Sequence, residues 1–597
     1  MKPKAATPKA QTPSDSKVLM WVLLVGAVLG VVAAAVLSRR HQPTGYESRS
    51  TTRPTFHRDV APIIYNHCAP CHHPGQAAPF NLLSYSDVKK RARQIREVVE
   101  QRNMPPWLPD PSDGPFVGQR SLSPEQISLI QRWVEQGALE DPMSDARPAP
   151  RLNEGWQLGT PDLVIRMTEP FSLAADGPDI YRNFVIPIST SVRRFVRGVE
   201  LQPGNSRIVH HAFMRIDATR ESRRRDEQEP GPGFSGLHTP TSAQTPPGQF
   251  LSWQPGKMHT FAPRGLAWTL ETNCDLVLQM HLRPSGKPEV IQSSIGFYFA
   301  EEAPTNAPFK AGLQTYAIDI PAGARDHVIH DSYMLAADVE VLSLLPHAHY
   351  LAKELQAFAT LPDGRQKPLM HIRNWNFDWQ GDYQFQKPVF LPRGTALSMI
   401  WHYDNSTNNA RNPHHPPQRV RYGLQSSDEM AELWLQMLPV RTNDLAALAR
   451  YDQPRVFHAA VAYNEYLLGL NPNNARAHNE IGRARLFLGQ TVEAEASLRR
   501  AAGLDATFDE PHYFLGLLFR TRNNLAAAAN EFAAAVRLNP ANAKAHGNLG
   551  LVFLAQGDFD NAESHLRTAL SLNPQDEIAR TALADIAKTR KENSKRN

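Results

Sequence analysis

The chain has 597 residues, of which 41% are hydrophobic and 21% charged, and its formal net charge is +5. This length exceeds what one hydrophobic core can organise, so several domains are expected. Apart from the short run Arg223–Arg225 the basic residues are dispersed, which excludes the clustered basic surface typical of nucleic-acid-binding proteins.

The N-terminal region predicts a membrane anchor. Residues 1–17 are polar and lysine-rich, and we expect them to form a cytoplasmic tail. Residues 18–37 are twenty uncharged, mostly apolar residues, enough to span a bilayer as a helix. A cleaved signal peptide is the alternative, but charged residues rather than a small-residue cleavage site follow. Residues 38–52 are expected to be a linker.

A Cys-x-x-Cys-His motif follows at Cys68, Cys71 and His72. It predicts covalent attachment of a c-type heme through two thioethers, with His72 as the proximal iron ligand. A zinc site would need a second cysteine pair, and the only other cysteine is Cys274. Because c-type heme is attached outside the cytoplasm, we expect a single-pass protein of the bacterial cytoplasmic membrane with its bulk on the periplasmic side.

The motif does not identify the sixth ligand of the heme iron. Met104 lies in a Met-Pro pair of the kind found in proteins that resemble c-type cytochromes, and it is the preferred candidate. Methionine would raise the reduction potential relative to a second histidine. His57, His67 and His73 are alternatives, although the last two are close to the attachment point.

Residues 53–142 carry helical patterns, so the motif is expected to belong to an α-helical, cytochrome c-like domain. In one of these patterns Ser123 is the predicted N-cap, Pro124 the first helical residue and Gly137 the C-cap. The proline-rich stretch 143–155 is then expected to be a linker.

Residues 156–440 change character, because short β-type runs recur there between turn signals. This spacing predicts two β-sandwiches of the jelly-roll type, at 156–305 and 306–440. The polar, Pro/Gly-rich stretch 219–250 is expected to be a mobile excursion from the first.

Histidines with apolar neighbours are the candidate metal ligands in this region. Five imidazoles and one thioether are proposed as ligands: His210, His211, His281, His347, His349 and Met430. A set of imidazoles with a thioether suits copper better than zinc or calcium. Each residue alone would more often be structural, and only the combination points to metal.

The spacing of these histidines carries geometric expectations. His347 and His349 are two residues apart, so on a strand both side chains would project from one face. His210 and His211 are adjacent and would point to opposite faces of a regular strand. Binding one metal therefore requires a bulge or a strand end at that point.

The candidate ligands lie in the motifs VHHAFM, LQMHLRPSGKPE, PHAHYLAKEL and QSSDEM, in this order. With these motifs, residues 156–440 resemble the type II copper, ascorbate-dependent monooxygenases, which include peptidylglycine alpha-hydroxylating and dopamine beta-monooxygenases. The resemblance implies an electron-transfer copper held by His210, His211 and His281. It also implies a catalytic, oxygen-activating copper held by His347, His349 and Met430.

Two features depart from the family. Its animal members are disulfide-rich, whereas this region holds only Cys274. Leu345 stands where the peptide-amidating member has an arginine that grips the substrate carboxylate, so a glycine-extended peptide is an improbable substrate.

The C-terminal region is a repeat. Pro540 and Pro574, in two copies of Leu-Asn-Pro, lie 34 residues apart, and Gly482, Gly516 and Gly550 keep the same period. This predicts tetratricopeptide repeats over 455–592, after a linker at 441–454. Such helical solenoids offer a surface to a protein partner.

Together these features predict a membrane-anchored copper monooxygenase that hydroxylates a C–H bond of an unidentified organic substrate with O2. Its expected cofactors are covalent heme c, which supplies electrons, and two copper ions. The first alternative is a non-catalytic heme and copper protein for electron transfer or copper handling. The second is an assembly factor in which the repeats hold a partner and copper is dispensable.

Overall fold

The computed structural model describes residues 53–74, 78–141, 155–237, 239–240, 242–263 and 265–596. The predicted tail 1–17, anchor 18–37 and linker 38–52 lie outside these ranges, as does nearly all of the linker 143–155. The chain divides into two units, Met1–Pro54 and Thr55–Asn597, and the helices and strands of the described ranges belong to the second.

The predicted single-pass anchor is not supported. None of the helices in the described ranges is both long enough and apolar enough to cross a membrane. The two longest, α7 (Asp444–Leu470) and α14 (Glu577–Arg596), carry charged residues along their length. The transmembrane part of the predicted fold class, and the membrane localisation derived from it, are therefore wrong for the part of the chain that the structure describes.

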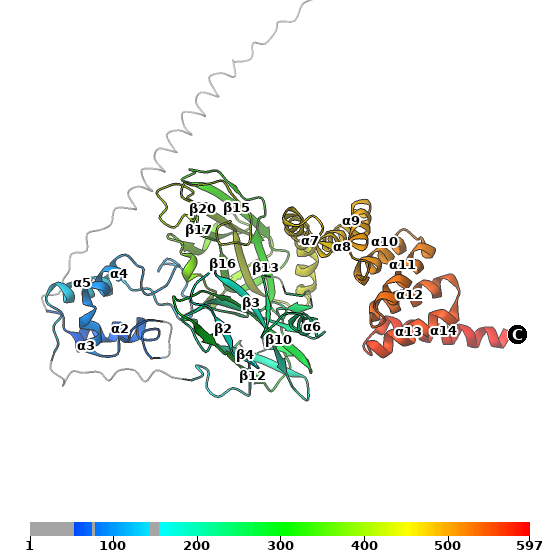
Figure 1. The fold of residues 1–597 in the computed structure, drawn as a ribbon, viewed down its shortest axis with the longest axis horizontal. Helices are drawn as coiled ribbons and strands as arrows, with labels where there is room; N and C mark the ends of the chain where they lie inside the picture. Colours follow the sequence, from blue (N-terminus) through cyan, green and yellow to red (C-terminus); the bar gives the residue numbers. More distant parts are fainter. Residues whose placement is uncertain are drawn as a thin grey trace, which may run out of the picture. The chain divides into compact units, whose positions relative to one another are not determined.

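The segment with the heme motif contains short helices (Figure 1). They are η1 (Phe56–Val60), α2 (Ala61–His67), α3 (Tyr85–Lys90), α4 (Ala92–Glu100) and α5 (Pro124–Glu135). Helix α5 begins as predicted, because Ser123 and Gln126 form a reciprocal capping box with Pro124 at the first position. The C-cap is Gln136 rather than the predicted Gly137, which follows it with φ +93° and ends the helix one position later.

These helices do not make the self-contained cytochrome domain that the sequence predicts, and this part of the fold class is also corrected. Helix α4 ends at Glu100, and residues 106–118 run along the second sandwich instead. Phe116 is fully buried there and belongs to that sandwich's core.

The first sandwich pairs two antiparallel sheets, with strand orders β1-β12-β4-β9 and β6-β3-β10-β5-β7; β8 also pairs with β5, and β2 with β11. One core joins both sheets and includes Phe184, Leu276 and Phe297. Strand β10 is buried throughout because it lies between β3 and β5. The strands are β1 (Leu163–Arg166), β2 (Phe171–Leu173), β3 (Ile180–Ile188), β4 (Arg194–Gln202), β5 (Val209–Asp217), β6 (Phe234–Ser235), β7 (Ala243–Gln244), β8 (Ser252–Trp253), β9 (Trp268–Leu270), β10 (Cys274–Leu282), β11 (Glu289–Ile291) and β12 (Ser294–Ala300).

The second sandwich has strand orders β13-β22-β16-β19 and β15-β20-β17-β18, with a small β14-β21 pair. Its core includes Leu344, Trp401 and Leu433. Its elements are β13 (Phe309–Gln314), β14 (Asp319–Ile320), β15 (His327–Met334), β16 (Val339–His347), β17 (Ala352–Thr360), β18 (Gln366–Ile372), η3 (Phe377–Trp379), β19 (Tyr383–Leu391), β20 (Ala396–Tyr403), β21 (Val420–Arg421) and β22 (Glu432–Pro439).

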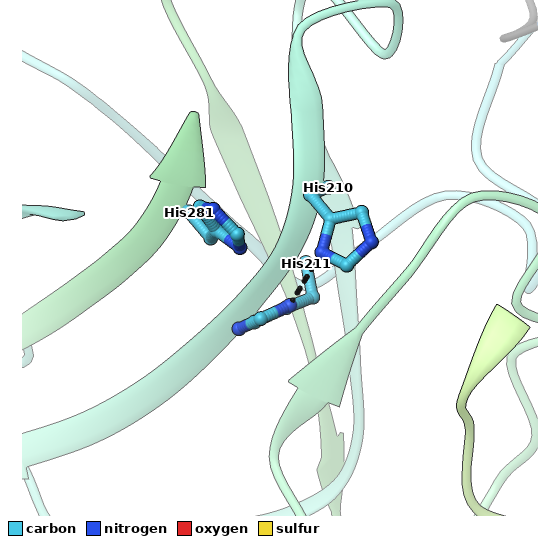
Figure 2. Close-up of side chains that lie close together, drawn as sticks. All are labelled: His210, His211 and His281. Atoms are coloured by element: carbon cyan, nitrogen blue, oxygen red, sulfur yellow. Dashed lines mark hydrogen bonds between the residues drawn. The ribbon is translucent and has the colours of Figure 1, made fainter. Parts of the chain in front are cut away.

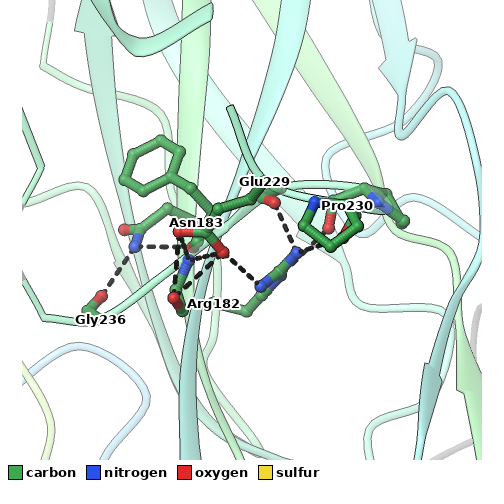
Figure 3. Close-up of polar contacts among 9 residues, drawn as sticks. Arg182, Asn183, Glu229, Pro230 and Gly236 are labelled. Atoms are coloured by element: carbon green, nitrogen blue, oxygen red, sulfur yellow. Dashed lines mark hydrogen bonds and ion pairs between the residues drawn. The ribbon is translucent and has the colours of Figure 1, made fainter. Parts of the chain in front are cut away.

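The described part of the stretch 219–250, which the sequence predicts to be a mobile excursion, forms short elements, and part of it pairs with β3. It contains α6 (Glu221–Asp226) and the short strands β6 and β7. Figure 3 shows Arg182 and Asn183 of β3 reaching this segment. Arg182 forms an ion pair of 3.0 Å with Glu229, and Asn183 Nδ2 donates to the Gly236 carbonyl at 2.7 Å.

The C-terminal helices form the predicted repeats. Helix α7 begins at Asp444, so most of the expected linker 441–454 is helical, and Pro454 lies inside the helix rather than before it. Paired helices follow at the 34-residue period, and Gly516 of α10 abuts Phe532 of α11. They are α8 (Ala475–Phe487), α9 (Thr491–Leu504), α10 (Asp509–Thr521), α11 (Leu525–Leu538), α12 (Ala543–Gln556) and α13 (Phe559–Leu572), closed by α14.

Candidate metal centre

Strands β5 and β10 bring the first three candidate ligands together. His281 of β10 pairs directly with His211 of β5, but the next residue, Leu282, pairs with Val209. His210 is therefore the extra residue of a bulge. The sequence requires such an irregularity if both neighbouring histidines are to face one site, and the structure has one at that position.

The three imidazoles face a common centre (Figure 2). One ring nitrogen from each of His210, His211 and His281 can be chosen so that all lie within 4.8 Å of one another. The Nδ1 atoms of His210 and His211 are 3.0 Å apart. Nδ1 of His281 is buried without a hydrogen-bond partner, and an orphaned buried nitrogen of this kind calls for a ligand.

Neighbouring groups orient these rings from outside. Asp179 Oδ2 lies 2.9 Å from Nε2 of His281, and the Tyr181 ring stacks on the His281 ring at 4.4 Å between centroids. A carboxylate on the far nitrogen of a histidine fixes its tautomer and leaves the other nitrogen for a metal. The donor set and its surroundings therefore fit a transition-metal ion.

Burial favours the neutral form of His211 and His281, the form that metal ligation requires. Desolvation lowers the pKa of His211 well below its usual value, and the nearby His210, His281, His347 and His349 lower it further. Desolvation likewise lowers the pKa of His281, although the hydrogen bond to Asp179 opposes the shift.

The second group of candidate ligands lies at the end of β16. His347 is the last residue of this strand and His349 lies two residues beyond its end, so the expected strand spacing does not apply. Their rings are nevertheless 5.2 Å apart between centroids. His349 is buried, and desolvation lowers its pKa to about 3.

Met430 is linked to His349 through its two preceding residues. The ring nitrogen Nδ1 of His349 lies 3.2 Å from the Asp428 carbonyl oxygen. The buried Glu429 carboxylate accepts hydrogen bonds from the backbone N–H groups of His349, Leu351 (2.9 Å) and Met430 (2.8 Å). These hydrogen bonds hold the backbone around Met430 against the backbone of residues 349–351.

The segment containing η3 joins the two groups. The Phe377 ring lies 5.3 Å from the His210 ring and 5.5 Å from the His349 ring, between centroids. In the residues that follow Phe377, Asp378 Oδ1 is 3.4 Å from Nε2 of His210, and Gln380 Oε1 is 2.5 Å from Nδ1 of His347. Both histidine groups thus contact the same short segment.

The heme-motif residues lie in a turn after α2. The backbone N–H groups of Cys71 and His72 donate to the Cys68 carbonyl at 3.1 and 3.0 Å. Nδ1 of His72 is 3.1 Å from the Phe80 carbonyl oxygen, which leaves Nε2 for an iron ion. These residues fit a covalent heme, whereas Met104 stays a prediction as the sixth ligand.

The residues that support the ligands were not predicted from the sequence: Asp179, Asp378, Gln380 and Glu429. Of these, only Glu429 had a sequence signal, because it directly precedes a candidate ligand. Asp179 and Gln380 are each more than 30 residues away from the histidine that they contact, so only the fold brings them there.

Comparison with known proteins bears on the C-terminal helices. Residues 513–587 match the tetratricopeptide repeat family, which confirms the predicted repeats there. Similar solved structures include two of MamA protein. One is 26% identical and covers 22% of this chain and 72% of that chain, with a TM-score of 0.21. The other is 23% identical and covers 23% of this chain and 91% of that chain, with a TM-score of 0.20.

A third similar structure is the first TPR of Spaghetti (RPAP3) bound to an HSP90 peptide. It is 21% identical and covers 19% of this chain and 91% of that chain, with a TM-score of 0.19. No curated protein matches the chain. The repeat match supports a protein partner for the C-terminal helices.

Proposed function

We propose that this chain is a copper-dependent monooxygenase that hydroxylates a C–H bond of an organic substrate with O2. The observation that carries the proposal is the convergence of His210, His211 and His281, with Asp179 behind His281. The second histidine group, which also contacts Phe377, supports a second copper ion. The family resemblance of the motifs agrees with both assignments.

The two groups offer different ligand types to copper. Three neutral imidazoles would hold one copper ion, and His347 and His349 with the Met430 thioether would hold the other. Thioether is a soft ligand and favours Cu(I). When bound, the copper ions would supply one-electron redox chemistry and oxygen activation, while the protein binds and orients the substrate.

The chain's own residues prepare the second group for this role. Glu429 and the Asp428 carbonyl fix the orientation of His349 relative to Met430. Gln380 holds Nδ1 of His347. Because these contacts are all present in the folded chain, little reorganisation is needed on binding, which favours affinity.

Covalent heme at Cys68 and Cys71, with His72 on the iron, is proposed as the electron donor. The fixed orientation of the His72 ring supports it. The tetratricopeptide helices are proposed to bind a protein partner. The substrate is an organic molecule other than a glycine-extended peptide, because Leu345 replaces the arginine that would grip such a substrate.

Oxygen consumption tests the proposal. The copper-loaded, heme-containing protein is reduced chemically without air and then mixed with O2, while O2 uptake and heme reoxidation are followed. We expect rapid uptake by the wild type and its loss in His349→Ala, with heme reduction unchanged. Uptake that survives His349→Ala would contradict a catalytic second site and would favour an electron-transfer or copper-handling protein.

A further inference from the structure

Residues 106–118 fasten the heme-motif segment to the second sandwich. Phe116 forms a β-bridge with Phe385 of β19. On either side of this bridge, the Val117 N–H donates to the Gln384 carbonyl at 2.8 Å and the Gln386 N–H to the Pro115 carbonyl at 2.9 Å. This backbone pairing and the burial of Phe116 fix where the segment leaves the sandwich.

A second set of contacts holds the start of this stretch against β18. The Asp110 N–H donates to the His371 carbonyl at 2.7 Å, and the Asp110 carboxylate pairs with Arg373 at 2.7 Å. The Arg373 side chain is more than half exposed. The ion pair therefore adds little to the free energy of folding and mainly fixes the position of Asp110 beside β18.

Arg120 joins the heme motif to the first sandwich. Its guanidinium lies 3.6 Å from Cys71 Sγ and donates to the carbonyl oxygen of Gly256. The Arg120 carbonyl oxygen is 3.1 Å from Nδ1 of His67, directly before the motif. Arg120 therefore contacts Cys71 of the motif and His67 directly before it while it also contacts the loop at Gly256.

Gly256 permits this close approach. It has φ +78°, and a Cβ atom at this position would lie 2.7 Å from Arg120 Nη1 and 3.1 Å from Cys71 Sγ. Only glycine adopts such a conformation without strain and leaves that space open. The loop backbone thus reaches the point where one heme thioether would form.

The same loop contacts the segment that reaches the second histidine group. Lys257 Nζ lies 2.9 Å from Asp382 Oδ1, and both side chains are mostly buried. Asp382 is two residues from Gln380, which holds Nδ1 of His347. A cavity of about 200 Å³ lies among these residues, with Trp107, Arg120, Lys257 and Gln380 in its lining.

We propose that Arg120 and Gly256 form an electron-entry contact that positions the heme motif against the Gln380–Asp382 segment, so that electrons reach the His347 group from this side. The inference rests on the proposed function. When bound, heme held by Cys68, Cys71 and His72 would supply one electron at a time, and copper held by His347 and His349 would accept it. Arg120 acts as a positioning residue, because it orients the motif and carries no electron itself.

The test uses the full chain with heme and copper bound, reduced at the heme and kept without oxygen. Heme oxidation is followed by absorbance and copper reduction by electron paramagnetic resonance. Arg120→Ala and Gly256→Ala should each slow the transfer by about tenfold or more, since small misplacements of reacting groups are amplified in rate. Arg120→Lys should restore part of the rate, and Arg365→Ala, which removes an exposed arginine paired only with Asp363, should leave it unchanged.

A readout independent of copper accompanies this rate. In the heme-containing, copper-free chain, hydrogen exchange at the backbone of Gly256 and Lys257 should be faster in Arg120→Ala than in the wild type. The helical content of the two proteins should be the same. If Arg120→Ala transfers electrons and exchanges hydrogen like the wild type, the inference is overturned. If the inference about Arg120 fails while the proposed function holds, the chain still binds copper and consumes O2 with a chemical reductant. If no copper binds, both the inference and the proposed function fail.

Discussion

The carboxylate of Asp179 lies 2.9 Å from Nε2 of His281, and Nδ1 of the same ring is buried without a partner among the described residues. One nitrogen is therefore held by a carboxylate while the other faces His210 and His211. This arrangement is what a metal-binding histidine needs from its surroundings. It distinguishes His281 from a buried structural histidine, whose two ring nitrogens would both find protein partners.

Removing this carboxylate should weaken metal binding without removing a ligand. Asp179→Asn should reduce copper affinity at the His210, His211 and His281 site by roughly 10- to 100-fold, measured by competition with a chelator. Asp326→Asn is the matched control, since Asp326 pairs with His402, which is not a candidate ligand. Equal affinity in the wild type and Asp179→Asn would argue against a metal at His281.

The buried Glu429 should matter for both stability and the second site. Glu429→Ala leaves the N–H groups of His349, Leu351 and Met430 without their acceptor, at a cost of about 1–3 kcal/mol for each buried group. We expect a lower thermal unfolding temperature and loss of copper from the second site, while the first site stays loaded. Glu429→Gln retains one acceptor oxygen and should be milder, and equal effects of both substitutions would contradict this role.

The repeat glycines offer a test of helix packing. A Cβ atom at Gly516 would lie 2.6 Å from the Phe532 ring, so Gly516→Ala should destabilise the repeats by about 1–3 kcal/mol. Gly503 in α9 has open space around it, and Gly503→Ala should stabilise by about 0.5–1 kcal/mol. Urea unfolding followed by helical circular dichroism measures both, and effects of the same sign would refute the packing explanation.

Glu510 gives the repeats a pH dependence. Burial, with repulsion from Glu480 and Asp509, raises the pKa of Glu510 to about 7 from 4.5. The folded state then holds this proton more tightly than the unfolded chain, so the contribution of Glu510 to stability is full below pH 4.5 and is lost as the pH rises to about 7. Glu510→Gln should stabilise the repeats at pH 8 by on the order of 1 kcal/mol and have little effect at pH 4.

The matched control for this prediction is Glu563→Gln. Glu563 is paired with Arg567 at 2.6 Å and is not among the groups that raise the pKa of Glu510, so neutralising it should not stabilise the repeats. Urea unfolding at pH 4 and pH 8 measures both variants. A Glu510→Gln variant no more stable than the wild type at pH 8 would contradict the raised pKa.

Much of this molecule could be predicted from local sequence patterns. The 34-residue period identifies the repeats because each helix pair reuses the same small residues, such as Gly516, at its crossing. The strand runs were predictable because alternation of buried and exposed residues is a local property. The need for a bulge at His210 follows from the two-residue period of a strand.

Other features depend on contacts between residues far apart in sequence. Nothing local indicates that Asp179 meets His281 or that Gln380 meets His347, since the fold alone determines these pairs. The stretch 106–118 follows α4 and so falls within the predicted helical domain, yet its aromatic and proline residues pack on β19. The helical start of α7 could not be predicted because Pro454 is typical of a helix boundary rather than an interior.

Copper stoichiometry of the full-length protein tests the central claim most directly. Elemental analysis of the copper-loaded wild type should give two copper ions per chain. One should remain after His210→Ala with His211→Ala, and one after His347→Ala with His349→Ala. A wild type that retains no copper, or a copper content that neither pair of substitutions changes, would contradict the account.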